Sequence, residues 1–413
     1  QAASGQAAYR LQLGYQQGHA DVVLSSSLQG LGLDLPVPLR KEAEAILPLR
    51  LQSSWQGPGR DELRLELGST LQAHYLRDIT SEPARVLRGA LAIQDTLPAL
   101  PPSGVHLQAN LGQVNLDAWN ATVQRLFGAG GETFDGSLGA GYAPNQIALR
   151  AQSLQVSGRS LTKLVAGINR VPDEGGWRFK LDAEQLNGLV ELRSARPGPG
   201  GQAGRVYARL ARLSLPKQEA DSVTELLDKQ PGSVPALDIV VEDFELRGKR
   251  LGRLEVEAQA TGAARDWRLN RLQLRHPDAV LNATGQWVNE PGQAQRRTAL
   301  DWTMEVADAG NLLERLGQGR VLRGGRGQLS GQIGWQGSPL SPDYASMNGQ
   351  LHVALDAGQF LKAEPGVGRL LGVLSLQSLP RRFLLDFRDV FSEGFSFDGV
   401  AGDVKIARGL ASS

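Results

Sequence analysis

The chain has 413 residues, and its 44 Lys and Arg against 43 Asp and Glu give a net charge of +1. This balance argues against a nucleic-acid-binding surface, which normally carries a basic excess. The sequence contains no cysteine, which excludes disulfides and thiolate metal sites, and it has no run of about 18 apolar residues that could cross a bilayer as a helix.

Alternation of apolar and polar residues dominates the sequence along its whole length. A period of two is typical of antiparallel β-strands that face water on one side only. The 50 glycines lie scattered between these segments and predict many turns and bulges rather than disorder. We therefore predict a mostly β fold. The clearest alternating segments are residues 63–67, 105–109, 177–181, 254–260, 300–306 and 351–355.

Four short helices are predicted from apolar residues that recur at helical spacing. The third is expected to begin after Asp308, because aspartate is a good N-cap residue. The fourth is uncharged apart from Arg369, so it must be buried or lie against lipid. The helices are predicted near residues 117–127, 217–228, 308–316 and 366–379.

A Trp-Arg pair recurs at a similar position in two alternating segments. The pairs are Trp177-Arg178 and Trp267-Arg268, which lie 90 residues apart. This spacing is longer than that of the common solenoid repeats and favours repeated sheet modules. A chance recurrence of the pair is the alternative.

The few helices cannot cover one face of so many strands. An apolar sheet face must be buried against a second sheet, against itself in a closed barrel, or against a ligand. A long apolar face that stays open marks a binding groove or a lipid site. The alternation alone does not separate these solutions, because a closed β-sandwich carries the same pattern.

No arrangement typical of catalysis or metal binding is found in the sequence. The five histidines lack the spacing of a zinc-binding pair, and neither a nucleophile elbow nor a phosphate-binding loop motif occurs. We interpret the Gly- and Arg-rich residues 317–327 as a turn between strands. Asp386 and Asp389 lie beside three arginines in the sequence, which favours structural ion pairs over an acid–base pair. We predict no catalytic residue, no metal and no cofactor.

Two parts of the chain resemble one protein family. The matching residues are 365–366 (PG), 369–372 (RLLG), 379–382 (LPRR), 386–391 (DFRDVF) and 394–395 (GF) near one end, and 27–31 (SLQGL) and 35–41 (LPVPLRK) near the other. In this order and composition they resemble the AsmA-like region of YhdP-type proteins from Gram-negative envelopes.

The resemblance implies a long, curved antiparallel β-sheet, taco-like in section, that forms an open apolar groove of repeating units with a few short helices. It implies non-enzymatic transfer of phospholipid between the inner and outer membranes, with the acyl chains in the groove. We expect residues 1–413 to be a continuous groove segment of a longer, inner-membrane-anchored chain in the periplasm, with the AsmA-like C-terminal region at residues 234–413. Envelope proteins are implied as further partners, and nucleic acid is not.

The lipid-binding residues that this reading predicts are the apolar members of the alternating segments. A register slip of one residue would move the whole set to the other face. In the fourth helix, Val367, Leu370, Leu371 and Leu374 are predicted to plug the groove or to meet a membrane. The predicted lining residues are Leu65, Leu67, Val105, Leu107, Phe179, Leu181, Leu254, Val256, Ala258, Leu300, Trp302, Met304, Leu351, Val353 and Leu355.

Two other functions are open at this point. One is an envelope assembly scaffold built as a closed β-sandwich or solenoid, with no lipid path. The other is an enzyme acting on envelope glycans or lipids, which the missing motifs disfavour. A continuous open apolar trough would separate the lipid carrier from both alternatives.

Overall fold

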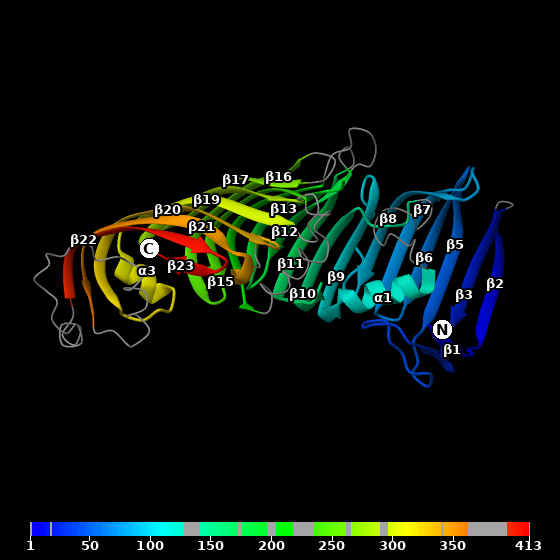
Figure 1. The fold of residues 1–413 in the computed structure, drawn as a ribbon. Helices are drawn as coiled ribbons and strands as arrows, with labels where there is room; N and C mark the ends of the chain where they lie inside the picture. The colour runs from blue at the N-terminus through cyan, green and yellow to red at the C-terminus, as the bar shows by residue number, and fades with distance from the viewer. Residues whose placement is uncertain are drawn as a thin grey trace, which may run out of the picture. The chain divides into compact units, whose positions relative to one another are not determined.

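The computed structural model describes residues 2–16, 19–127, 141–171, 175–195, 204–217, 235–261, 266–289, 296–339, 342–361 and 395–412. The chain divides into two compact units, Gln1–Leu189 (unit 1) and Val190–Ser413 (unit 2). Strands make up most of both units, as the alternation predicts (Figure 1).

In unit 1 the strands form one linear ladder. The ladder begins at β2, whose one partner among the described residues is β3, and it continues from β5 to β12 in chain order. Strands β1 and β4 form a separate antiparallel pair. The bounds are β1 (Ala3–Gly5), β2 (Tyr9–Gln16), β3 (His19–Ser26), β4 (Leu31–Leu33), β5 (Leu49–Gly57), β6 (Arg60–Leu67), β7 (Leu71–Asp78), β8 (Arg85–Ile93), β9 (Gly104–Asn115), β10 (Gln146–Val156), β11 (Arg159–Val171) and β12 (Gly176–Asp182).

The strands of unit 2 form a second linear ladder in chain order. It runs from β14 to β23, and β23 pairs with β22 alone among the described residues. Strand β13 (Leu186–Arg193) spans the boundary between the units. The bounds are β14 (Arg205–Leu215), β15 (Ala236–Leu246), β16 (Lys249–Thr261), β17 (Asp266–His276), β18 (Ala279–Val288), β19 (Arg297–Val306), β20 (Leu322–Gln336), β21 (Asn348–Phe360), β22 (Phe395–Ala407) and β23 (Leu410–Ser412).

Most neighbouring strands are antiparallel, as predicted, but three of the strand pairs that the structure describes are parallel. These pairs are β8–β9, β9–β10 and β14–β15. A parallel pair needs a connection long enough to bring the chain back to the starting end of the sheet. Residues 94–103, 116–145 and 216–235 connect these strands, whereas two-residue turns join antiparallel neighbours such as β5–β6, β10–β11 and β17–β18.

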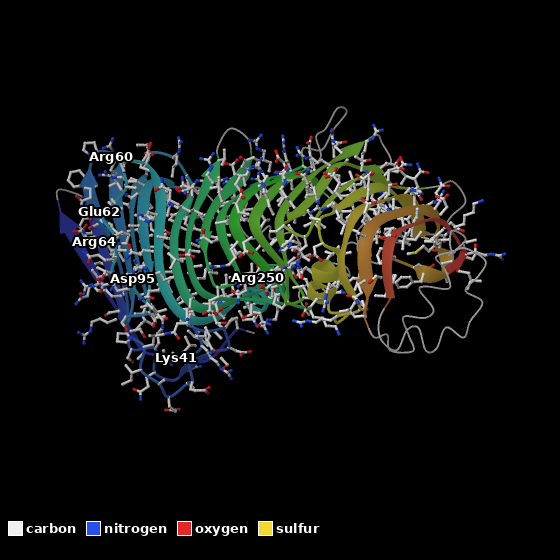
Figure 2. All side chains as sticks on the ribbon, turned by 90° about the vertical axis from the view of Figure 1, so that its left-hand side faces the viewer. Lys41, Arg60, Glu62, Arg64, Asp95 and Arg250 are labelled. Atoms are coloured by element: carbon white, nitrogen blue, oxygen red, sulfur yellow. The ribbon has the colours of Figure 1, made fainter. Side chains whose placement is uncertain are left out.

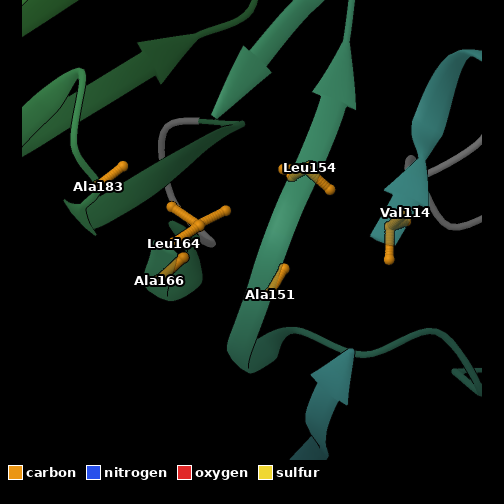
Figure 3. Packing of buried hydrophobic residues seen from close by; sticks show 6 residues of the cluster. All are labelled: Val114, Ala151, Leu154, Leu164, Ala166 and Ala183. Carbon is orange, nitrogen blue, oxygen red and sulfur yellow. The ribbon is translucent and has the colours of Figure 1, made fainter. Parts of the chain in front are cut away.

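Helix α1 (Leu116–Phe127) lies where a helix is predicted near residues 117–127. Its first turn is tied to the β10–β11 turn, because the two carboxylate oxygens of Asp117 accept hydrogen bonds from Ser157 N (2.7 Å) and Gly158 N (2.9 Å). Leu116 and Trp119 pack against a buried cluster that is formed by β9, β10, β11 and Ala183, the residue after β12. Figure 3 shows this cluster, which consists of Val114, Ala151, Leu154, Leu164, Ala166 and Ala183.

Helix α3 (Ala309–Arg315) lies within the predicted range 308–316, and Asp308 is its N-cap, accepting a 2.9 Å hydrogen bond from Asn311 N through Oδ1. Leu312 and Leu313 pack against Val306 and Leu322 of unit 2. A short 3₁₀ helix, η2 (Tyr344–Ser346), precedes β21. The helices predicted near 217–228 and 366–379, with Val367, Leu370, Leu371, Leu374, Asp386 and Asp389, lie outside the described residues apart from Lys217.

Glycine is required where β20 and β21 approach closely. A Cβ atom on Gly331 would lie 2.5 Å from the carbonyl oxygen of Gln350 and 3.1 Å from Cα of Leu351. Gly331 also pairs with Trp302, so its missing side chain leaves room for a large neighbour on the same face. The high glycine content therefore serves strand packing as well as turns at this point of the sheet.

Candidate functional site

An unbroken row of apolar residues, here called the middle row of unit 1, crosses the ladder from β2 to β12. Paired residues of neighbouring strands point to the same face of a sheet, so the row lies on one face. We call the face that carries it the apolar face of unit 1. From β2 to β12 the row consists of Leu11, Leu24, Leu51, Leu65, Ala73, Leu91, Leu107, Ile147, Ile168 and Phe179.

All six lining residues predicted in unit 1 lie on this face. Leu65, Leu107 and Phe179 belong to the row itself. Leu67 and Leu181 belong to the adjacent row, and Val105 lies in the row on the other side, between Gly89 and the start of β10. The strand register thus brings the predicted residues together on a single surface.

Unit 2 has the same construction. The face that carries its middle row is called the apolar face of unit 2. The adjacent row on one side includes Leu254, Met304 and Val353. Ala258 and Leu300 lie in the row on the other side. From β14 to β22 the middle row consists of Ala208, Ile239, Val256, Leu272, Ala283, Trp302, Gly331, Leu351 and Val404.

The alternate residues form a polar face on the reverse side of each ladder. In unit 1, Arg60, Glu62 and Arg64 follow one another along β6 on this side (Figure 2). In unit 2, a hollow of about 830 Å³ is lined by polar-face residues such as Asn282 and His352 together with middle-row residues such as Trp302 and Leu351. The alternation of residues along each strand therefore separates a polar face from an apolar face in both units.

The apolar faces are partly exposed rather than sealed. Of the fifteen predicted lining residues, Val105, Leu254, Ala258 and Val353 are buried, and the other eleven are half-buried. A second sheet packed onto the face would bury such residues fully, as in a β-sandwich. Within the described parts of each unit, the apolar clusters join residues of neighbouring strands of one ladder, together with α1 or α3. This arrangement is an open apolar face and not a closed sandwich.

The two ends of the strands in unit 2 differ in character. Leu355 lies with Val306 and Leu322 near α3, which covers that end of the apolar face. Arg315 of α3 donates through Nε (2.9 Å) and Nη2 (2.8 Å) to Oδ2 of Asp278, in the turn between β17 and β18. At the opposite end the register aligns the buried tryptophans Trp267, Trp287 and Trp335 with Thr298.

An ion pair lies on the apolar face of unit 1, at the end of β6 and β7 away from α1. Arg77 forms a two-pronged hydrogen-bonded pair with Asp61 and donates through Nη1 to the hydroxyl of Tyr142 (3.0 Å). Ser53 Oγ donates to the same carboxylate (3.0 Å). The hydrogen bonds to Asp61 raise the pKa of the Arg77 guanidinium, and burial raises the pKa of Tyr75 to about 12.

The sequence-based prediction missed the tryptophan row and the Asp61–Arg77 pair. Both could have been found by following the phase of the alternation, because Asp61 has the same parity as Leu63 and Leu65. A charged residue in the apolar phase of a strand needs a partner on the same face of the next strand, which here is Arg77.

The described residues contain no cluster of three or more His, Asp or Glu side chains placed to hold a metal ion. In the same part of the chain, no helix combines the length and the apolar character needed to cross a membrane. The residues that the structure brings together are apolar rows, an ion pair and a tryptophan row, and their chemistry suits the binding of an amphipathic ligand.

Comparison with known proteins gives a family and a relative. The sequence model of the YhdP protein family matches residues 1–413. The chain is 26% identical over 401 residues to the intermembrane phospholipid transporter YhdP of Escherichia coli (strain K12), and the match covers 94% of this chain and 30% of the transporter. The chain thus spans less than a third of that relative's length. No solved structure matches the chain.

Proposed function

The chain belongs to the YhdP family, and from this premise we propose that the apolar faces of its two units carry phospholipid acyl chains between the inner and outer membranes. The observation that carries the proposal is the pair of unbroken apolar rows that cross ten strands in unit 1 and nine in unit 2 and remain partly exposed. The fifteen predicted lining residues are the proposed contact surface.

The free energy of binding comes from burial of the acyl chain. Each CH₂ group moved from water onto an apolar surface gains about 0.8 kcal/mol. The residues along a row are similar in chemistry, such as Leu272 and Leu351 on either side of Trp302. An acyl chain that shifts by one strand, about 4.8 Å, therefore exchanges one apolar contact for another, which keeps the barrier to sliding low.

Transfer of this kind forms and breaks no covalent bond. We therefore propose a non-enzymatic function with no catalytic residue. The relative's name describes an intermembrane phospholipid transporter, which supports a periplasmic position for this chain as part of an inner-membrane-anchored protein of a Gram-negative bacterium. The helix predicted near residues 366–379 remains a proposed plug or membrane contact.

Charge substitutions on the two faces of one strand test the proposal. A carboxylate on the apolar face of the sheet must be desolvated when an acyl chain lies over it, at a cost of several kcal/mol. We expect Trp302→Glu in unit 2 and Leu107→Glu in unit 1 to lower the phospholipid that co-purifies with the chain by about tenfold or more. Mass spectrometry of extracted lipid, per mole of protein, gives the measurement.

The matched controls are the neighbouring residues on the polar face. Thr303→Glu and Gln108→Glu add the same charge one residue away, so they should leave the bound lipid unchanged. Near-ultraviolet circular dichroism checks that each variant keeps its tertiary structure. The proposal fails if both faces respond equally, or if folded Trp302→Glu and Leu107→Glu proteins carry as much phospholipid as the unsubstituted chain.

A further inference from the structure

The tryptophan row of unit 2 lies at the boundary between the apolar face and the strand ends. We call this boundary, with Trp267, Trp287, Thr298 and Trp335, the Trp end of unit 2. Indole rings favour such boundaries because they combine a large apolar surface with one N–H donor. Trp287 packs in the same cluster as Leu272 and Leu300, so the row is continuous with the proposed acyl surface.

Trp287 differs from its two neighbours in its hydrogen bonding. The indole N–H groups of Trp267 and Trp335 donate to the carbonyl oxygens of Pro235 (3.4 Å) and Ser338 (2.9 Å). Trp287 is 2% exposed, and its Nε1 has no hydrogen-bond partner in the described residues. A buried donor without a partner is unfavourable, so a ligand that supplies an acceptor there gains binding free energy.

A cation lies directly beside this donor. The guanidinium carbon of Arg296 lies 5.2 Å from the ring centroid of Trp287, which is a cation–π contact. Arg296 comes just before β19 and is half-buried. The Trp end thus combines an unpaired N–H, a guanidinium group and an apolar surface.

The other end of the same face is closed. Helix α3 packs there over Val306 and Leu322, and Asp278 holds Arg315 in place through two hydrogen bonds. Lys249, a cation at that end, donates to the carbonyl oxygen of Leu316, next to the end of α3. At the Trp end, by contrast, a cation lies against an indole ring whose N–H has no hydrogen-bond partner among the described residues.

The two ends of the strands in unit 1 differ in the same way. Its α1 packs against Leu154 and the rest of the cluster at one end of the strands. Trp55 and Trp177 lie in the apolar phase at the opposite end, where the Asp61–Arg77 pair also lies. In each unit, a helix therefore occupies one end of the apolar face and tryptophan with arginine occupies the other.

We infer that a phospholipid bound to unit 2 lies with its glycerol–phosphate region at the Trp end and its acyl chains toward Leu272 and Leu300. Arg296 faces the phosphate, and the Trp287 N–H donates to an acyl ester carbonyl once the guanidinium group shifts toward the phosphate. This inference rests on the proposed function, and it adds the orientation of the lipid and the two side chains that set it.

Photocrosslinking of the 413-residue chain tests the orientation. The probes are two phosphatidylethanolamines, one with a diazirine in the headgroup and one with a diazirine at the acyl terminus, in mixed phospholipid vesicles. Mass spectrometry of the digested protein then gives the labelled peptides. We expect the headgroup probe to label peptides that contain residues 286–289 and 296–298, and we expect no headgroup labelling of peptides from 304–316.

Three variants assign the labelling to side chains. Trp287→Phe keeps the aromatic ring and removes the N–H, and Arg296→Gln removes the charge; each should lower headgroup labelling at the Trp end by about fivefold. Arg297→Gln is the control, because Arg297 is exposed on the polar face of β19. It should label like the unsubstituted chain.

Each outcome bears on one of the two proposals. Headgroup labelling at the α3 end, or equal labelling in Arg296→Gln and Arg297→Gln, overturns the orientation while the lipid-carrying function stands. Absence of labelling by the acyl probe and absence of co-purified phospholipid in the unsubstituted chain overturn both. Circular dichroism of Trp287→Phe separates a loss of folding from a loss of binding. Arg296→Gln tests the same orientation independently, through the loss of headgroup labelling.

Discussion

The Asp61–Arg77 pair of unit 1 allows a quantitative test of how this sheet tolerates charge on its apolar face. Asp61 is 6% exposed, and its carboxylate is held by Arg77 and Ser53. Removing one partner of a buried ion pair leaves the other charge uncompensated and costs about 3–5 kcal/mol, whereas replacing both by apolar residues is often close to neutral.

We therefore predict that Arg77→Met and Asp61→Leu each destabilise unit 1 by about 3–5 kcal/mol, and that the double variant is far less affected. For a unit of this size, 1 kcal/mol lowers the melting temperature by about 2–4 °C, so each single variant should melt roughly 6–20 °C lower. Calorimetry measures the shifts, and hydrogen exchange in β6 and β7 localises them to unit 1.

The double variant decides between this account and simple loss of packing. A favourable interaction energy in the cycle of about 2 kcal/mol or more is expected, because the two side chains are in direct contact. Single variants that melt within 2 °C of the parent would refute the reasoning. A double variant as unstable as the sum of the singles would refute it equally.

Two further predictions concern His74 and Gly331. Burial lowers the pKa of His74 below 6.5 in the folded chain. As the pH falls through 6.5, the unfolded chain binds more protons than the folded chain, so the folded chain loses stability. The melting temperature of His74→Gln should therefore fall less between pH 7.5 and pH 5.5 than that of the unsubstituted chain. In Gly331→Val the new Cβ would lie 2.5 Å from the Gln350 carbonyl oxygen, so the free energy of unfolding should fall by about 1–3 kcal/mol. Ser330→Val, on the polar face, should change the melting temperature little. Equal changes in melting temperature for the two variants would contradict the close-approach argument.

Local alternation was sufficient to place every predicted lining residue on an apolar face. The period of two is a property of the extended backbone, so Leu63, Leu65 and Leu67 share a face whatever strand lies beside them. The same reasoning located α1 and the N-cap Asp308, because helix spacing and capping are also local. These features depend on the segment and not on its neighbours.

Features that depend on strand order could not be predicted in this way. The parallel pairing of β8 with β9 depends on where residues 94–103 bring the chain back, and no periodic signal records that. The alignment of Trp267, Trp287 and Trp335 also depends on the register of four strands. The open face is likewise non-local, because the alternation in 300–306 fits a sandwich equally well.

The proposed transfer of phospholipid requires that the lipid be bound without being trapped, and the placement of charge in unit 1 fits this requirement. An unpaired arginine on the apolar face would bind a phosphate group strongly, since charge-assisted hydrogen bonds strengthen in a dry environment. Arg77 is instead neutralised by Asp61, and it also donates a hydrogen bond to the hydroxyl of Tyr142. The contacts along the middle row of unit 1 from Leu11 to Ile168 are aliphatic and nearly equivalent, as between Leu65, Leu91 and Leu107. In unit 1, burial of the acyl chain therefore provides affinity with no preferred position along the row, and the paired Arg77 does not fix a headgroup at one strand.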